Sequence, residues 1–392
     1  MTRSKPIYLD YNATTPVEPG VVEAMAPYLH ALFGNPSSAH PYGAEARAGV
    51  EQARHQLATM IGCASGEVVF TGGGTESNNM AIIGAAERAG RRGGHLIISS
   101  IEHPAVIEPC RYLERRGFEV SVVPVDTHGR VDPEDVQRAM KADTILVSVM
   151  HANNEVGTMQ PVAEIAAIAR RHGALMHTDA AQTAGKCELK VDELGVDMLS
   201  IAGHKLYAPK GVGALYIRSG VILERFLHGA DHEQHRRAGT ENVPAIVGLG
   251  EAARLTVDEG AAGSAHMATM RSRLLHGLES ALEGKAEWQL NGHPTYCLPN
   301  TLSLSVKHIE ASTLLAEIQD RVALSAGAAC HADRVEMSHV LQAMHVPEAF
   351  GMGTMRISTG RMTSSHEVNE AARVIAEAIL RHLSKHGPCS SK

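Results

Sequence analysis

The chain has 392 residues, of which 44% are hydrophobic and 20% charged, with a formal net charge of −7. This length suffices for a large domain and a smaller one, while the acidic balance without a basic stripe argues against nucleic acid or an anionic membrane as partner. No apolar run approaches the roughly 20 residues that span a bilayer, and residues 1–10 lack the apolar core of an export signal, so we expect a cytoplasmic protein.

Helices are expected over residues 17–33 and 44–60. Short β-branched runs then alternate with helical stretches of about ten residues, which is typical of βαβ units on a mostly parallel sheet. The expected strands cover residues 68–70, 96–99, 120–123, 144–149, 174–177, 198–201 and 214–217, and the helices between them cover 77–89, 105–116, 133–140 and 162–172.

The pattern changes past residue 250. One long helix is expected over residues 252–282, interrupted near its glycines at 260–263, followed by a smaller α+β region. That region has expected strands at 302–306 and 355–358, helices at 312–321, 337–344 and 367–384, and a disordered tail from 387. We therefore expect a large domain over 17–260 and a small domain formed by 1–16 and 261–392.

The six cysteines have no C-x-x-C pair and no regular spacing, so we expect reduced thiols and no disulfide framework. Among the 23 histidines, His232 and His235 are spaced i, i+3, and no third ligand is evident. The spacing differs from the i, i+4 pair of a metalloprotease helix. We therefore expect no metal site.

Polar residues follow four successive strands. His103, Asn154, Asp179 and Lys205 each come shortly after a strand, and the glycine-rich segment 71–79 follows the first strand. In an open parallel sheet the carboxyl ends of the strands form the ligand site. Glycines before a helix suit a phosphate group. A lysine, a carboxylate, a flat imidazole and a phosphate cradle are the parts that pyridoxal 5′-phosphate (PLP) requires.

The chain resembles the NifS/IscS-like cysteine desulfurases, class V aminotransferase-like enzymes of PLP fold type I, over nearly its whole length. The motifs that carry this resemblance lie at residues 8–16, 33–38, 71–79, 153–155, 178–182, 202–213, 237–242 and 355–358. The resemblance implies an α/β fold with a mostly parallel sheet flanked by helices. It also implies a homodimer that takes L-cysteine to L-alanine and passes the sulfur to an acceptor protein, with roles in iron–sulfur cluster synthesis among the possibilities.

Carried over onto this sequence, the resemblance implies roles for individual residues. Lys205 would link PLP covalently, Asp179 would pair with its ring nitrogen, His103 would stack on the ring, and Gln182 would bond its phenolic oxygen. The phosphate group would be held by the residues Gly74, Thr75, His204 and, from a second subunit, Thr240.

For the substrate, the resemblance implies that Arg356 grips the carboxylate with help from Asn154 and Asn35. Cys330, in a segment of small residues, would take the sulfur as a persulfide, with His103 assisting deprotonation of its thiol.

Two departures from the desulfurase pattern leave an alternative open. Ala202 stands where a phosphate-binding serine is usual, and alanines replace the serine-rich residues before Cys330. Both features are similar to selenocysteine lyases, which would release selenium from L-selenocysteine by the same cofactor chemistry. An aminotransferase, or a cofactor-binding protein without activity, would be further alternatives.

Overall fold

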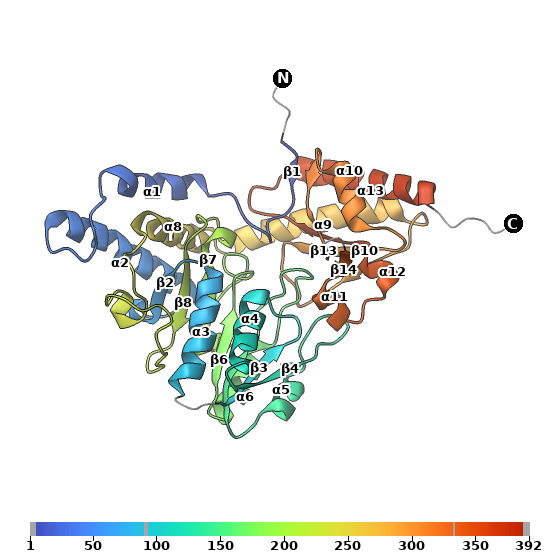
Figure 1. The fold of residues 1–392 in the computed structure, drawn as a ribbon. Coiled ribbons are helices and arrows are strands. Elements are labelled where there is room, and N and C mark those ends of the chain that lie inside the picture. Colours follow the sequence, from blue (N-terminus) through green and yellow to red (C-terminus); the bar gives the residue numbers. More distant parts are fainter. Residues whose placement is uncertain (1–4, 90–92, 332–333, 387–392) are drawn as a thin grey trace.

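The computed structural model describes residues 5–89, 93–331 and 334–386, with the backbone alone for 328–331, 334–335 and 385–386. The predicted disordered tail from residue 387 lies outside the described residues. A large sheet with helices on both faces forms one part of the molecule, and a smaller sheet with long helices forms the other (Figure 1). None of the described helices is long and apolar enough to cross a membrane.

The large sheet has seven strands in the order β2-β8-β7-β6-β5-β3-β4. β8 runs antiparallel to both neighbours, and all other pairs are parallel. The mostly parallel α/β sheet predicted from the sequence is thereby confirmed. The strands are β2 (Val68–Thr71), β3 (His95–Ser99), β4 (Glu119–Val123), β5 (Thr144–Ser148), β6 (Leu175–Asp179), β7 (Met198–Ala202) and β8 (Gly213–Ile217).

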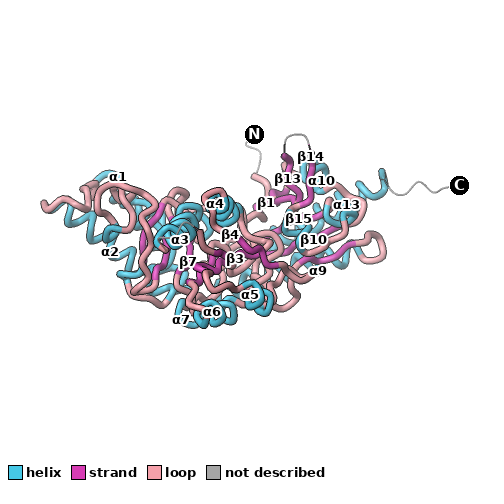
Figure 2. The backbone as a smooth tube through the Cα atoms, turned by 60° about the horizontal axis from the view of Figure 1, so that its bottom comes forward, coloured by secondary structure: helices cyan, strands magenta, loops and turns pink. Residues whose placement is uncertain are grey.

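Helices cover this sheet on both faces (Figure 2). α3 (Gly74–Arg88) and α4 (Pro104–Glu114) lie on one face, and α5 (Pro133–Ala139), α6 (Val162–Arg171) and α7 (Val191–Leu194) lie on the other. Separate clusters of buried apolar side chains fill the two interfaces. Because most strands are covered on both sides, they are nearly continuous apolar runs.

α3 begins three residues earlier than predicted. Gly73 has a φ of 147°, which side chains rarely tolerate, so the chain turns sharply after β2 and the helix starts at Gly74. Gly74 and Thr75 therefore belong to the first helical turn and not to a loop. The free N–H groups of that turn lie next to the carboxyl end of the sheet.

The helix predicted over residues 252–282 begins too late, whereas its predicted interruption near residues 260–263 is confirmed. α8 (Val243–Glu259) begins at an N-cap, where the Asn242 side chain accepts from the Ala245 N–H, and Pro244 lies in the first turn. Gly260, with φ 52° and ψ −136°, ends α8, and α9 (Ala261–Leu282) follows directly. α8 packs against α1 (Pro19–His30) and α2 (Pro41–Ile61).

The smaller sheet has the antiparallel order β12-β15-β10-β9 and packs on α9, α10 (Ala311–Ile318) and α13 (Ser365–His386) around its own apolar core. Its strands are β9 (Trp288–Asn291), β10 (Thr301–Val306), β12 (Ser325–Ala326) and β15 (Thr354–Ser358). β1 (Ile7–Tyr8) pairs with β11 (Val322–Ala323), so the N-terminal segment lies on the C-terminal part. The division into domains 17–260 and 1–16 with 261–392 stays a prediction.

The helix predicted over residues 337–344 starts too early. β13 (Ala328–His331) pairs antiparallel with β14 (Arg334–Met337). The short α11 (His339–Ala343) begins only after Ser338, whose hydroxyl accepts from the Val340 N–H. α12 (Glu348–Gly351), which the sequence did not predict, precedes β15.

Candidate active site

A pocket of about 360 Å³ lies at the carboxyl ends of β5, β6 and β7. Its volume falls within the roughly 300–1,000 Å³ of small-molecule sites. Most of the residues singled out in the sequence line it, namely Gly74, Thr75, His103, Asn154, Asp179, Gln182, His204, Lys205 and Arg356. The fold thus brings together residues that lie up to 282 positions apart in the sequence, from Gly74 to Arg356.

Asp179 is the last residue of β6 and has both carboxylate oxygens engaged. Its Oδ2 accepts from Asn78 Nδ2 at 2.7 Å, and its Oδ1 accepts from the Ala181 N–H at 2.9 Å. These two hydrogen bonds fix the orientation of the carboxylate. Asn78 was not singled out from the sequence, although it lies within the glycine-rich segment; its buried Oδ1 has no partner among the described residues.

Lys205 ends a short 3₁₀ turn, η2 (Gly203–Lys205), directly after β7. Burial lowers the pKa of its amine, while the nearby charge of Asp179 acts in the opposite direction. Gly203 is required there, because an added Cβ would lie 2.8 Å from the Val212 carbonyl oxygen. A lysine with a lowered pKa is more often neutral, which is the form that attacks a carbonyl carbon.

His103 is the N-cap of α4, and its Nδ1 accepts from the Ala105 N–H at 3.1 Å. This bond fixes the tautomer of the neutral ring, with the proton on Nε2. Burial lowers the pKa of the imidazole. His103 therefore lines the pocket as a flat, uncharged ring.

One end of the pocket suits a phosphate group. The first turn of α3 places Gly74 and Thr75 there, and His204 lies beside them with Nδ1 3.2 Å from Thr14 Oγ1. Burial, with help from Lys205 and other positive charges, lowers the pKa of His204 to about 4. An added Cβ on Gly74 would lie 3.1 Å from the Cβ of Ala202, so a side chain at position 74 would narrow this end.

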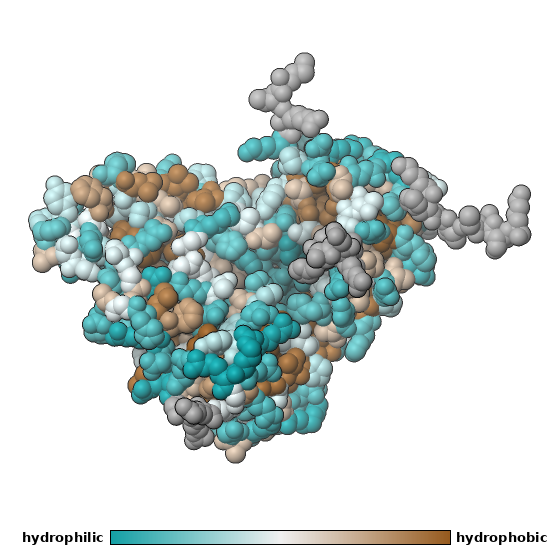
Figure 3. Space-filling model, in the orientation of Figure 1, coloured by the Kyte–Doolittle hydropathy of each residue, from teal (hydrophilic) through white to brown (hydrophobic). Residues whose placement is uncertain are grey.

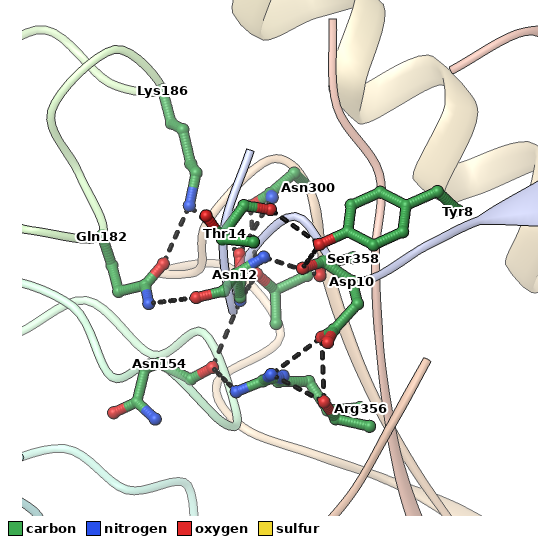
Figure 4. A network of polar contacts seen from close by, with 12 residues as sticks. Tyr8, Asp10, Asn12, Thr14, Asn154, Gln182, Lys186, Asn300, Arg356 and Ser358 are labelled. Atoms are coloured by element: carbon green, nitrogen blue, oxygen red, sulfur yellow. Dashed lines mark hydrogen bonds and ion pairs between the residues drawn. The ribbon is translucent and has the colours of Figure 1, made fainter. Parts of the chain in front are cut away.

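Arg356 enters the pocket from β15 of the smaller sheet (Figure 4). Its Nη2 donates to Asp10 Oδ1 at 2.8 Å and to Ser325 Oγ at 2.9 Å, and its Nη1 lies 3.3 Å from the backbone oxygen of Asn154. Its buried Nε has no partner among the described residues. Asp10 was missed as an individual residue, although it lies in the motif at residues 8–16.

The lining fits PLP on two observations. Asn78 Oδ1 and Arg356 Nε are both buried and without a partner in the described part of the chain, which leaves a donor and an acceptor for a ligand. The pocket also places a carboxylate at its floor and a helix N-terminus at one end, which match a ring nitrogen and a phosphate group.

Two predicted residues, Asn35 and Thr240, do not line this pocket. Asn35 is exposed, with its Oδ1 bound to the Ser37 N–H at 2.9 Å, and Thr240 is exposed as well. The backbone of Cys330 lies in β13 opposite Val335, while its thiol is outside the described side chains. Within the described residues, no group of three or more His, Cys, Asp or Glu side chains could hold a metal ion.

Comparisons with known proteins agree with this geometry. The family model for aminotransferase class-V matches residues 7–370. The chain is 44% identical to the cysteine desulfurase IscS of Dictyoglomus turgidum, with 95% of this chain and 94% of the relative covered. It is also 44% identical to the cysteine desulfurase IscS of Methanosarcina thermophila, with 99% of this chain and 96% of that relative covered.

Solved structures lead to the same family. A NifS-like protein superposes with a TM-score of 0.88 at 38% identity, covering 95% of this chain and 99% of that protein. A structure described as SspA in complex with cysteine gives a TM-score of 0.79 at 35% identity, covering 92% and 100%. The chain belongs to the PLP-dependent aminotransferase class-V family.

Proposed function

We propose that this protein is a PLP-dependent cysteine desulfurase, which converts L-cysteine to L-alanine and transfers the sulfur to Cys330 as a persulfide. The observation that carries the proposal is that Lys205, Asp179 and Arg356 line one pocket. The amine and the carboxylate suit the cofactor, and the guanidinium suits the substrate carboxylate. Relatives named cysteine desulfurase, at 42–44% identity over nearly the whole chain, support it.

Arg356 would bind the substrate carboxylate. Asp10 and Ser325 both hold its Nη2, so the guanidinium is oriented before substrate arrives. The unpartnered Nε leaves an N–H donor for the substrate carboxylate. Asp10 thus offsets the positive charge of Arg356 while the pocket is empty of substrate.

Bound PLP would supply a positively charged ring that withdraws electrons from the substrate α-carbon. The carboxylate of Asp179 would hold the proton on the ring nitrogen, and two hydrogen-bond donors keep that carboxylate in place. The amine of Lys205 would bind the cofactor's carbonyl carbon, and when released it would move a proton at the substrate α-carbon.

Cys330 would then accept the sulfur. Its thiolate attacks the substrate sulfur, so that a sulfur–sulfur bond forms and the carbon–sulfur bond breaks, and the carbon left behind gains a proton to give alanine. His103 was predicted to take the thiol proton, and this role would require release of the Ala105 N–H from Nδ1, because the neutral ring has no other free lone pair. The transfer needs no external oxidant or reductant, since the sulfane sulfur stays on the protein.

A selenocysteine lyase is not favoured. The relatives named above are cysteine desulfurases, and one matching structure is described as a complex with cysteine. Ala202 changes only the phosphate end of the pocket, next to Gly74, away from Arg356. The other departure, the alanines before Cys330, involves side chains that lie outside the described residues.

A second copy of the chain would complete the site. Thr240 and Asn35 are exposed and outside the pocket of their own chain. Apolar side chains are exposed on α1 and just after it, including Leu29 and Phe33, both 68% exposed, and apolar residues gather over α1 (Figure 3). A homodimer that covers this face and brings Thr240 to the phosphate group of the neighbouring subunit would account for the exposed apolar residues and for the exposure of Thr240.

The test is mass spectrometry of the purified protein after exposure to L-cysteine. We expect one added sulfur on the peptide that contains Cys330, together with alanine in solution. Cys330→Ala should lose both, and Cys297→Ala, at another free cysteine, should keep both. Alanine formed at the wild-type rate by Cys330→Ala, or pyruvate formed in place of alanine, would refute the proposal.

A further inference from the structure

Lys186 is a buried lysine that the proposed reaction does not use. It follows β6 by seven residues and is only 2% exposed. Desolvation, together with the positive charges of Lys205 and Arg356, lowers the pKa of its amine to about 7, while the Cys187 thiol acts in the opposite direction. A cation is costly in such a place, so its contacts require an explanation.

Its amine makes two hydrogen bonds, both to side-chain amide oxygens (Figure 4). Nζ lies 2.8 Å from Oε1 of Gln182 and 3.1 Å from Oδ1 of Asn12. Both amides belong to residues that line the cofactor pocket. Lys186 therefore lies behind the pocket wall and reaches the pocket only through these two side chains.

These contacts determine which way the Gln182 amide faces. An ammonium group only donates, so the atom beside Lys186 must be the amide oxygen. The other amide atom lies 3.0 Å from the backbone oxygen of Asn12, which only accepts, so it must be the nitrogen. One N–H of Gln182 is thereby used, and the second remains for an oxygen atom of a ligand.

Asn12 extends the same network to the substrate side. Its Nδ2 donates to the backbone oxygen of Asn154 at 3.2 Å, and that oxygen also receives Nη1 of Arg356. Its Oδ1 accepts from Asn300 as well as from Lys186. A single buried amine thus links the residue next to the cofactor with the residue next to the substrate carboxylate.

We propose that Lys186 is a positioning residue, which fixes the amide of Gln182 so that it presents an N–H donor, and never its carbonyl oxygen, to the phenolic oxygen of bound PLP. This inference rests on the proposed cofactor contact of Gln182. The donor and the positive charge behind it stabilise the deprotonated form of the lysine-bound cofactor. Without Lys186 the amide is free to turn, and its oxygen would then face an oxygen.

The main experiment is a pH titration of the cofactor absorbance in the holoenzyme, without substrate. Lys186→Met, of similar shape but without donor or charge, should raise the midpoint of the spectral transition by about one pH unit. The affinity of the apoprotein for PLP should fall as well. Lys285→Met is the matched control and should change neither quantity. Lys285 is exposed, and its Nζ donates to the backbone oxygen of Ala281 at the end of α9.

A double-mutant cycle separates positioning from a general structural effect. If Lys186 acts through Gln182, Lys186→Met should shift the midpoint little once Gln182→Leu is present, because coupled residues are not additive. Additive shifts, or a wild-type midpoint in Lys186→Met, would overturn the inference. Neither readout requires sulfur transfer, so failure of persulfide formation on Cys330 would leave this test intact.

A second variant covers the case in which Lys186→Met does not fold. Gln182→Glu keeps an acceptor for Lys186 and removes the N–H that faces the cofactor. The midpoint should therefore rise beyond that of Gln182→Leu, since a carboxylate oxygen replaces the donor. A wild-type midpoint in Gln182→Glu would also overturn the inference.

Discussion

Ala202 is the residue that departs most from the expected cofactor site. It ends β7, is buried, and faces the first turn of α3 at the phosphate end of the pocket. A methyl group there makes no hydrogen bond. The phosphate group would then depend on the N–H groups of α3, on Thr75 and on His204.

Restoring a hydroxyl at this position is expected to tighten cofactor binding. Ala202→Ser should lower the dissociation constant for PLP roughly 5- to 30-fold, because one hydrogen bond to a charged group is worth about 1–2 kcal/mol. Fluorescence titration of the apoprotein measures the change. Ala208→Ser, at a buried alanine outside the pocket lining, serves as control, and an unchanged constant in Ala202→Ser would show that the position does not contact phosphate.

Glu102 lies beside His103 and is fully buried. Its Oε1 accepts from the Ser99 hydroxyl at 2.5 Å and from the Met150 N–H at 2.8 Å, while Oε2 has no partner among the described residues. Desolvation raises the pKa of this carboxyl to about 8. The side chain is therefore neutral in the folded protein at neutral pH.

A raised folded-state pKa makes stability depend on pH. The unfolded chain ionises Glu102 near pH 4.5, so the stability gained from the neutral form is complete below that pH and is lost as the pH rises through about 8. Glu102→Gln should match the wild type near pH 4.5 and exceed it at pH 8, by up to about 5 kcal/mol. Urea unfolding between pH 4.5 and 8 measures the free energy of unfolding of each variant, with Glu114→Gln, at an exposed glutamate, as control. The same pH dependence of that free energy in Glu102→Gln and the wild type would contradict the prediction.

At the scale of elements, a buried ion pair anchors the turn η3 (Glu233–His235). Arg54 of α2 donates from Nη1 and Nη2 to both carboxylate oxygens of Glu233, at 2.7 and 2.8 Å, and Glu233 Oε2 also accepts from the Phe70 N–H. The three residues of η3 have left-handed φ values of 48°, 56° and 67°. Such a strained turn persists only where its surroundings hold it.

Breaking this pair is expected to be costly. Glu233→Gln would leave the buried guanidinium of Arg54 with the exposed Glu51 as its remaining counter-charge, which costs about 3–5 kcal/mol. Glu108→Gln, which breaks an ion pair with both partners about 60% exposed, should cost less than about 1 kcal/mol. Chemical denaturation compares the two variants, and equal losses would mean that burial does not govern the pair.

At the scale of the whole molecule, the pocket depends on parts that are remote in sequence. The N-terminal segment supplies Asn12 and Asp10, the large sheet supplies Asp179 and Lys205, and the smaller sheet supplies Arg356. Relative movement of the two parts would change the pocket. Thr240 is exposed and outside this pocket, so its predicted contact with the phosphate group would have to come from another copy of the chain.

Mixing two defective variants tests that shared site. Lys205→Ala should be inactive and Thr240→Ala weakened in cofactor binding, each as a homodimer. Subunit exchange should restore activity at limiting PLP, since one site of the hybrid then has Lys205 from one chain and Thr240 from the other. Desulfurase activity before and after exchange is the measurement. A mixture no more active than the sum of its parts would place Thr240 outside the neighbour's site.

Much of this arrangement could be predicted from the sequence, because strand ends on a parallel sheet converge at one edge. The polar residues after β3, β5, β6 and β7 were therefore expected to meet, and they do. Element boundaries were less predictable. The early start of α3 at Gly74 depends on the local φ angle of Gly73, which composition does not determine, whereas the break between α8 and α9 at Gly260 was expected from the glycines near residues 260–263.

The sequence by itself determined the α/β class, the family and the set of residues that carry charge and nucleophilicity. Only the tertiary structure decided which of them share a hydrogen bond. Asp10 beside Arg356, Asn78 beside Asp179 and Lys186 behind Gln182 are separated by 346, 101 and 4 positions. The physical reason is that periodicity reports which face of an element is buried, whereas partners across an interface follow from how separate elements pack.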